Sequence, residues 1–166
     1  MAASSETPEA PSANELRAFA YRLLGRREYS VFELRQRLLQ KWGDASDLDV
    51  LVEDLLEALV DENLLSDERF VESFARSRVA RYQGPLKIRA ALRQKGVEDR
   101  LIAAELDAPS GSWADLAAEW LDRQHAGPVD FEARKKLYRR LANRGFTHDQ
   151  AMDAIDRLSR QSTPDI

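Results

Sequence analysis

The sequence predicts an all-α protein, and three observations lead to that prediction. First, Ala and Leu together number 45 of the 166 residues, whereas Val, Ile and Thr number only 15. Ala and Leu lose little side-chain freedom in a helix, while β-branched residues suit strands. Second, none of the six prolines interrupts an apolar helical stripe, where it would break the helix. Third, apolar side chains recur three and four residues apart, without sustained alternation of apolar and polar residues.

The first third of the chain contains three predicted helices. The first covers about residues 14–27 and has an apolar face. The second begins at a predicted capping box, in which Ser30 caps the helix and Glu33 reaches back, and it ends near Gly43. The third helix has the most regular apolar stripe of the chain, formed by Leu48, Leu51, Val52, Leu55, Leu56 and Leu59.

The middle third of the chain contains three more predicted helices. The fourth predicted helix starts near Ser66, and its aromatic side chains are Phe70, Phe74 and Tyr82. The fifth begins at Pro85, because proline at the first helical position costs no hydrogen bond, and it ends at Gly96. The sixth runs from about 98 to 107.

The last third repeats the same plan. A break over residues 109–111 precedes the seventh predicted helix, whose stripe includes two tryptophans. The eighth follows residues 127–128, Gly-Pro, and ends at Gly145. The ninth is capped by Thr147 and Gln150, which have the spacing of a capping box.

Three glycines divide the nine helices into three repeats. Gly43, Gly96 and Gly145 each end the middle helix of a three-helix unit and lie 53 and 49 residues apart. The sequence therefore predicts an elongated tandem array of three three-helix repeats, over residues 14–65, 66–108 and 109–161, with disordered tails at 1–13 and 162–166. A single nine-helix bundle with coincidental spacing is the alternative.

The charges alternate in blocks that the net charge of −4 conceals. Residues 44–68 contain ten acids and no base, and residues 73–97 contain seven bases and no acid. Residues 98–133 then contain nine acids against two bases, and residues 134–146 contain six bases and no acid. This balance excludes a uniformly basic nucleic-acid binder but allows a basic face.

The two basic runs lie on corresponding parts of the second and third repeats, and we predict that they bind a polyanion or an acidic protein. The alternative is that the acidic blocks neutralise them within the molecule. On this prediction, charge reversal of two of these arginines, Arg89 and Arg93, should weaken the binding and leave the helical content unchanged. The candidate binding residues are Arg76, Arg78, Arg81, Lys87, Arg89, Arg93, Lys95, Lys135, Lys136, Arg139, Arg140 and Arg144.

The residues that most enzymes use are scarce. Cysteine is absent, and the two histidines, His125 and His148, lie far apart outside any cluster with metal-ligand spacing. No glycine-rich phosphate loop is present. We therefore predict a protein that is not an enzyme and that uses no metal or cofactor. The chain has no apolar run of membrane-spanning length and no secretory signal, so we expect a cytoplasmic monomer without a membrane partner.

Several segments together resemble one known family. Residues 64–70, Leu-Leu-Ser-Asp-Glu-Arg-Phe, and residues 82–97, Tyr-Gln-Gly-Pro-Leu-Lys-Ile-Arg-Ala-Ala-Leu-Arg-Gln-Lys-Gly-Val, resemble the central signature of the RecX regulatory family. Residues 26–30, Arg-Arg-Glu-Tyr-Ser, resemble its first repeat, and residues 143–146, Asn-Arg-Gly-Phe, resemble the end of its penultimate helix. One departure is Trp42, which precedes Gly43 where a basic residue precedes the other two repeat glycines.

The resemblance implies a modulator of the RecA recombinase. It implies that the chain binds the RecA–single-stranded DNA filament along its groove. It further implies inhibition of ATP hydrolysis, of strand exchange and of the co-protease activity that triggers the SOS response. Direct contact with single-stranded or duplex DNA is left open.

Two other functions fit the residues. A three-helix unit could act as a helix-turn-helix that regulates by binding DNA, although no predicted helix starts with a cluster of side chains suited to reading base edges. A helical scaffold for an unrelated protein is the third. Sequence-dependent DNA binding would identify the helix-turn-helix regulator. Indifference to RecA would identify the scaffold.

Overall fold

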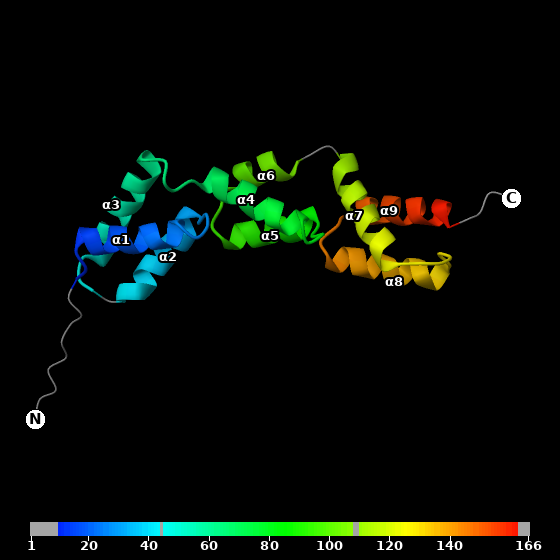
Figure 1. Cartoon of the computed structure of the whole chain (residues 1–166), viewed down its shortest axis with the longest axis horizontal. Helices are drawn as coiled ribbons and strands as arrows, with labels where there is room; N and C mark the ends of the chain where they lie inside the picture. The colour runs from blue at the N-terminus through cyan, green and yellow to red at the C-terminus, as the bar shows by residue number, and fades with distance from the viewer. Residues whose placement is uncertain (1–9, 44, 108–109, 163–166) are drawn as a thin grey trace, which may run out of the picture. The chain divides into compact units, whose positions relative to one another are not determined.

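The computed structural model describes residues 10–43, 45–107 and 110–162, and these residues form nine α-helices and no β-strand (Figure 1). The prediction of an all-α protein is therefore confirmed. The helices are α1 (Ala13–Leu24), α2 (Val31–Trp42), α3 (Leu48–Asp61), α4 (Asp67–Val79), α5 (Pro85–Gln94), α6 (Asp99–Leu106), α7 (Ser110–Gln124), α8 (Phe131–Asn143) and α9 (His148–Gln161).

These helices divide into two compact units. Unit 1 contains the described residues up to Val71 together with residues 95–97. Unit 2 contains residues 72–94 and the described residues from Glu98 onward. Helices α1–α3 thus belong to unit 1, and α5–α9 belong to unit 2, while α4 begins in the first unit and ends in the second.

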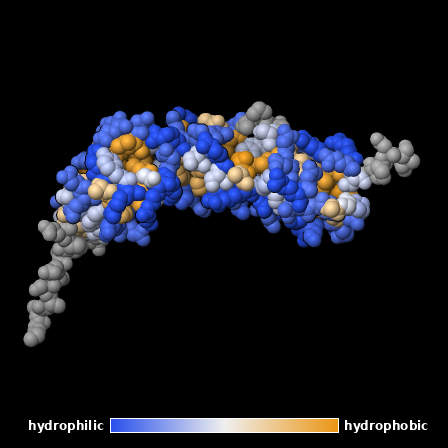
Figure 2. All heavy atoms as spheres, in the orientation of Figure 1, coloured by the Kyte–Doolittle hydropathy of each residue, from blue (hydrophilic) through white to orange (hydrophobic). Residues whose placement is uncertain are grey.

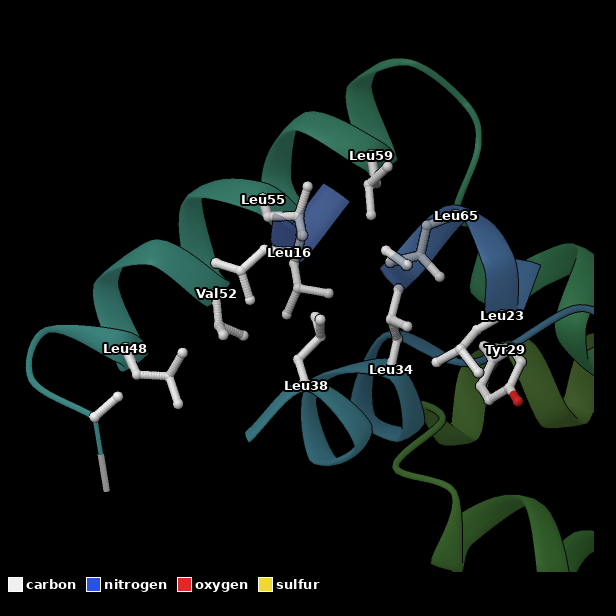
Figure 3. Close-up of a cluster of buried hydrophobic side chains, with 13 residues drawn as sticks. Leu16, Leu23, Tyr29, Leu34, Leu38, Leu48, Val52, Leu55, Leu59 and Leu65 are labelled. Carbon is white, nitrogen blue, oxygen red and sulfur yellow. The ribbon is translucent and has the colours of Figure 1, made fainter. Parts of the chain in front are cut away.

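In unit 1, α1, α2 and α3 pack against one another around a leucine-rich core (Figure 3). Leu16 of α1, Leu38 of α2 and Val52 of α3 point toward one another in the close-up and are fully buried. The stripe predicted for the third helix is buried except at Leu51, which is half-buried at the edge of the cluster. Burial of these apolar surfaces is the main stabilising contribution to the unit.

In unit 2, α9 packs against both α7 and α8, and α5 packs against α6. Leu121, Leu141 and Ile155 are buried between them. Trp113 of α7 is also buried, and its indole N–H donates a 3.0 Å hydrogen bond to the carbonyl oxygen of Leu106, at the end of α6. This bond satisfies the polar atom of a buried aromatic ring and ties α7 to α6.

Capping residues determine where several helices begin. Ser12 and Glu15 form a full capping box, so α1 begins at Ala13, one residue before the predicted start. The predicted box of Thr147 and Gln150 is confirmed. The box predicted at Ser30 is only half formed: its hydroxyl accepts the Glu33 N–H, whereas the Glu33 carboxylate binds Arg27 and Lys95 instead of reaching back.

Two other boundaries differ from the prediction. The fourth helix was expected to include Tyr82, but α4 ends at Val79, and Tyr82 lies in a turn with φ of 56°. Ser110 was expected in a break and instead begins α7. The predicted disordered tails lie largely outside the described residues, at 1–9 and 163–166.

The visible surface is mostly hydrophilic, with hydrophobic side chains exposed in small patches (Figure 2). None of the helices among the described residues has the length and apolar character that crossing a membrane requires.

Candidate partner-binding surface

The twelve candidate cations differ in how their charge is compensated. Five of them form ion pairs with carboxylates. These pairs are Arg76–Glu72, Arg89–Asp107, Arg93–Asp99, Lys95–Glu33 and Lys135–Glu132. For these five, the alternative raised by the sequence holds, because acids within the molecule neutralise the basic side chains. The pairs other than Lys95–Glu33 have a well-exposed partner and contribute little to stability, about 0–1 kcal/mol each.

Seven candidate cations have no carboxylate partner among the described residues. The guanidinium of Arg78 lies over the Phe74 ring, and the side chains of Arg81, Lys136 and Arg139 have no partner in the described part of the chain. The remaining three, Lys87, Arg140 and Arg144, contact neutral groups.

Four of these seven meet in unit 2, where the start of α5 contacts the end of α8. We call Arg81, Lys87, Arg140 and Arg144 the α5–α8 basic cluster. The guanidinium of Arg144 donates hydrogen bonds to the carbonyl oxygens of Arg81 at 2.9 Å and Tyr82 at 3.3 Å. Lys87 donates a long hydrogen bond, 3.4 Å, to the carbonyl oxygen of Asn143. All of these acceptors are neutral, so the cluster retains its positive charge.

The backbone holds this contact together. The Gly84 N–H donates to the Arg144 carbonyl oxygen at 2.7 Å, and the Leu86 N–H donates to the Gly145 carbonyl oxygen at 2.9 Å. These bonds join a donor-rich helix start to a carbonyl-rich helix end, which satisfies groups that neither helix can satisfy alone. A Cβ added to Gly145, whose φ is 92°, would lie 2.4 Å from the Cβ of Lys87. We call this contact the Gly145 junction.

Trp120 supports the arginines of the cluster. The guanidinium carbons of Arg140 and Arg144 lie 4.8 and 4.4 Å from the centroid of its ring. Trp120 is buried, as the sequence predicted, and it also provides a face for two cations. Its role could not be found from sequence spacing, because α7 and α8 are brought together only by the fold.

Tyr82 lies beside the same cluster. Its hydroxyl donates a 2.7 Å hydrogen bond to Glu119, and this bond raises the pKa of the Tyr82 phenol above its ordinary value. Arg123 pairs with the same carboxylate and lies over the Tyr82 ring. The Glu119 carboxylate is therefore engaged by Tyr82 and Arg123, not by the four cluster cations.

Lys95 lies apart from this cluster, in unit 1. Its ammonium binds Glu33 at 2.6 Å, and the carbonyl oxygen of the same lysine accepts the hydroxyl proton of buried Ser30 at 2.7 Å. A Cβ added to Gly96 would lie 2.5 Å from the Cβ of Phe32. We call this contact the Gly96 junction.

Glu33 is the central charge of the Gly96 junction. Its side chain is 11% exposed, and desolvation alone would raise the pKa of its carboxyl. Hydrogen bonds from Arg27 and Lys95 outweigh that burial, so the pKa of Glu33 lies below its ordinary value. Among the twelve candidate cations, Lys95 is therefore the one that pairs with a largely buried carboxylate.

The described residues contain no group of three or more His, Asp or Glu side chains that could hold a metal ion. The fold and the geometry define an all-α protein of three-helix units that presents a cluster of cations without carboxylate partners among the described residues. Residues 66–106 match the model of the second three-helix domain of RecX.

Relatives that align over most of their own length identify the family. The chain is 44% identical to the regulatory protein RecX of Chromohalobacter salexigens, over 82% of this chain and 88% of that protein. It is 40% identical to the RecX of Halorhodospira halophila, over 88% of this chain and 90% of that protein. A crystal structure of RecX from Lactobacillus salivarius shares the fold, with a TM-score of 0.75, 18% identity, and coverage of 89% of this chain and 97% of that chain. This chain belongs to the RecX family of regulatory proteins.

Proposed function

We propose that this chain is a non-catalytic cytoplasmic regulator that binds the RecA–single-stranded DNA filament in its groove. It inhibits RecA ATP hydrolysis, strand exchange and co-protease activity, and so modulates recombination, DNA repair and the SOS response. Family membership supports the regulatory role. The observation that carries the binding site is the α5–α8 basic cluster, because its four cations have no carboxylate partner among the described residues.

The chemistry of the cluster suits an anionic surface. Arg140 and Arg144 are held on Trp120, so little side-chain entropy is lost when they bind. Arg81 and Lys87 are exposed, so a partner can reach them. An acidic protein face or a phosphate backbone would supply the missing counter-charge, and binding would weaken as salt concentration rises.

The inhibition follows from the position of such a contact. A chain that lies in the filament groove and touches neighbouring protomers stabilises one arrangement of their interface. ATP hydrolysis and the entry of duplex DNA both need that interface to change, so a ligand that prefers one arrangement inhibits both. This mechanism needs no catalytic residue from the regulator.

The test is a titration of this protein into RecA that hydrolyses ATP on single-stranded DNA. A parallel binding assay uses the same DNA without RecA. We expect inhibition at protein concentrations too low to coat the DNA. Unchanged hydrolysis together with sequence-dependent binding to duplex DNA would contradict the proposal and favour a helix-turn-helix regulator. Unchanged hydrolysis without DNA binding would favour a scaffold.

A further inference from the structure

A second surface of unit 2 lies between α8 and the start of α9 and has a different character. It is an open cavity of about 560 Å³. Its lining combines Phe131, Tyr138, His148 and Met152 with charged residues of α8, among them Lys135 and Arg139. This volume is within the range of small-ligand pockets, roughly 300–1,000 Å³. Phe131 is 70% exposed, the most exposed of the large hydrophobic side chains in the described residues. An aromatic ring so open to water on the first turn of a helix needs an explanation.

Helical spacing places the aromatic and basic groups in one row. Phe131, Lys135 and Arg139 are four residues apart along α8, so they lie on one face and succeed each other by about 6 Å along the helix axis. The ammonium of Lys135 lies 4.8 Å from the centroid of the Phe131 ring. The row therefore offers a flat apolar ring followed by two cations.

The second wall of the cavity is also aromatic. Tyr138 and His148 meet edge to face, with ring centroids 5.5 Å apart, and the tyrosine hydroxyl lies 3.1 Å from the Nδ1 atom of His148. This contact fixes both rings. The backbone of α8 is held against α9 by Arg134, which binds Asp156 at 2.7 Å and Ser159 at 3.2 Å. The cavity is thus built on two helices that are joined by an ion pair.

The charges around the cavity favour an anion. Three of the lining residues are basic, and Glu132 is the one acid among them. Glu132 pairs with Lys135 at 3.4 Å, an exposed contact that a phosphate group can replace at little cost. Arg139 has no hydrogen-bond or ion-pair partner among the described residues, so its charge is available to a ligand.

We propose that this cavity binds one unpaired base of single-stranded nucleic acid. The base stacks on Phe131, and Lys135 and Arg139 bind the adjoining phosphates. Proteins that bind single strands combine aromatic stacking with a basic track in this way. A base inside a duplex presents no free face to an aromatic ring, so the site selects single strands. The proposal goes beyond binding to the filament, because it assigns a direct nucleic-acid contact to the third repeat.

The test separates bases from phosphates. Binding of the full-length protein is measured by fluorescence anisotropy on a labelled oligothymidylate and on an abasic oligonucleotide of equal length, without RecA. Phe131→Ala should weaken binding to oligothymidylate by roughly tenfold, and it should leave binding to the abasic strand unchanged. Phe131→Tyr keeps an aromatic ring, so it should keep the stronger binding to oligothymidylate than to the abasic strand. The double variant Lys135→Glu, Arg139→Glu should weaken binding to both.

Tyr21→Ala serves as the matched control, because Tyr21 is an exposed aromatic residue of α1 outside this cavity. It should bind both strands as the wild type does. Equal binding of oligothymidylate by the wild type and by Phe131→Ala would overturn the proposal, as would a wild type without measurable affinity for oligothymidylate. If Phe131→Ala bound both strands as the wild type does and lost only its inhibition in a separate RecA ATP hydrolysis titration, the cavity would hold a protein segment, and the proposal would again be wrong. Since these assays omit RecA, their failure leaves the proposed regulation of the filament standing.

Discussion

The two glycine junctions share a close approach to a helix start and differ in their charge. In both, the first turn of a helix lies so close to a glycine that an added Cβ would clash, Phe32 of α2 against Gly96 and Lys87 of α5 against Gly145. At the Gly96 junction, Lys95 is neutralised by the largely buried Glu33. At the Gly145 junction, Lys87 and Arg144 bind backbone carbonyl oxygens, and their charge stays uncompensated. The charge of the Gly96 junction is therefore neutralised within the fold, while the Gly145 junction retains a positive charge that can bind a partner.

The comparison also explains why the first repeat glycine is different. Gly43 ends α2, but a Cβ added there would have no neighbour within 4 Å. No earlier repeat precedes α2 among the described residues, so no helix start packs on this glycine. Trp42 replaces the basic residue found before the other two glycines, and it packs against Phe19 with ring centroids 5.4 Å apart. The departure noticed in the sequence is thus accounted for by position in the array.

The largest effect should come from filling the close approach itself. Gly145→Ala places a Cβ 2.4 Å from that of Lys87 and at a φ of 92°, and Gly96→Ala gives a similar clash with Phe32 at 2.5 Å. Each should lower the free energy of unfolding by about 3 kcal/mol or more, as backbone strain adds to overpacking. Gly43→Ala introduces backbone strain without a clash. Its decrease in the free energy of unfolding should therefore be smaller than that of either other variant, by about 1–3 kcal/mol. Urea denaturation followed by circular dichroism measures all three, and equal losses would show that the junctions are not tightly packed.

A smaller effect should distinguish two helix caps. Ser30 is fully buried, caps α2 through the Glu33 N–H at 3.0 Å, and donates to the Lys95 carbonyl oxygen. Ser30→Ala should therefore cost about 2 kcal/mol, because the cap is lost and a carbonyl oxygen is left unpaired. Asp130→Ala removes an exposed cap of α8 and should cost about 1 kcal/mol. Thermal unfolding of the two variants compares them, and an equal cost would mean that the Ser30–Lys95 bond is unimportant.

Of the two junctions, the Gly96 junction should lose stability in acid, because it contains the Glu33 carboxylate. Because the folded-state pKa of Glu33 is lowered, its ionised form stabilises the fold above the ordinary value of 4.5. That stabilisation is lost as the pH falls through the lowered pKa. The wild type should therefore be more stable than Glu33→Gln at neutral pH, and the difference should vanish at low pH. Urea midpoints over a pH series measure this, and a difference that persisted in acid would contradict the assigned role of the carboxylate.

The smallest effect should come from an isolated surface pair. Arg76 binds Glu72 one turn away on α4, and both side chains are well exposed. Arg76→Ala should change the free energy of unfolding by no more than about 0.5 kcal/mol, since an exposed pair at this spacing contributes little. A loss several times larger in the same denaturation assay would show that charge compensation on α4 matters to the fold.

Periodicity and helix-end residues predicted most of the fold. The apolar stripes gave all nine helices, since burial requires side chains three and four residues apart on one face. The misplaced features depend on distant residues. Glu33 could have completed a capping box, but Lys95, 62 residues away, competes for its carboxylate. Tyr82 continues the helical spacing of α4, but the turn before Gly84 is fixed by hydrogen bonds to α8.

The candidate site was predicted less completely. Block composition identified every cation of the α5–α8 basic cluster, but it could not separate them from the five that are neutralised. That distinction depends on which acids the fold brings near: Asp99 and Asp107 reach Arg93 and Arg89, whereas Glu119 is taken by Tyr82 and Arg123. Phe131 was not predicted as functional, and its position four residues before Lys135 was the signal available in the sequence.

The central claim is that the partner binds the α5–α8 basic cluster at the Gly145 junction and does not respond to net charge alone. The most direct measurement compares inhibition of RecA ATP hydrolysis by two double variants of equal net charge, Arg81→Glu with Lys87→Glu, and Arg89→Glu with Arg93→Glu. The first pair lies in the α5–α8 basic cluster, and the second pair is already neutralised by Asp107 and Asp99. With helical content unchanged in both, the first should lose inhibition by at least tenfold in concentration, and the second should stay near the wild type. Equal losses in the two variants would contradict the account, because they would show that the filament responds to net charge alone.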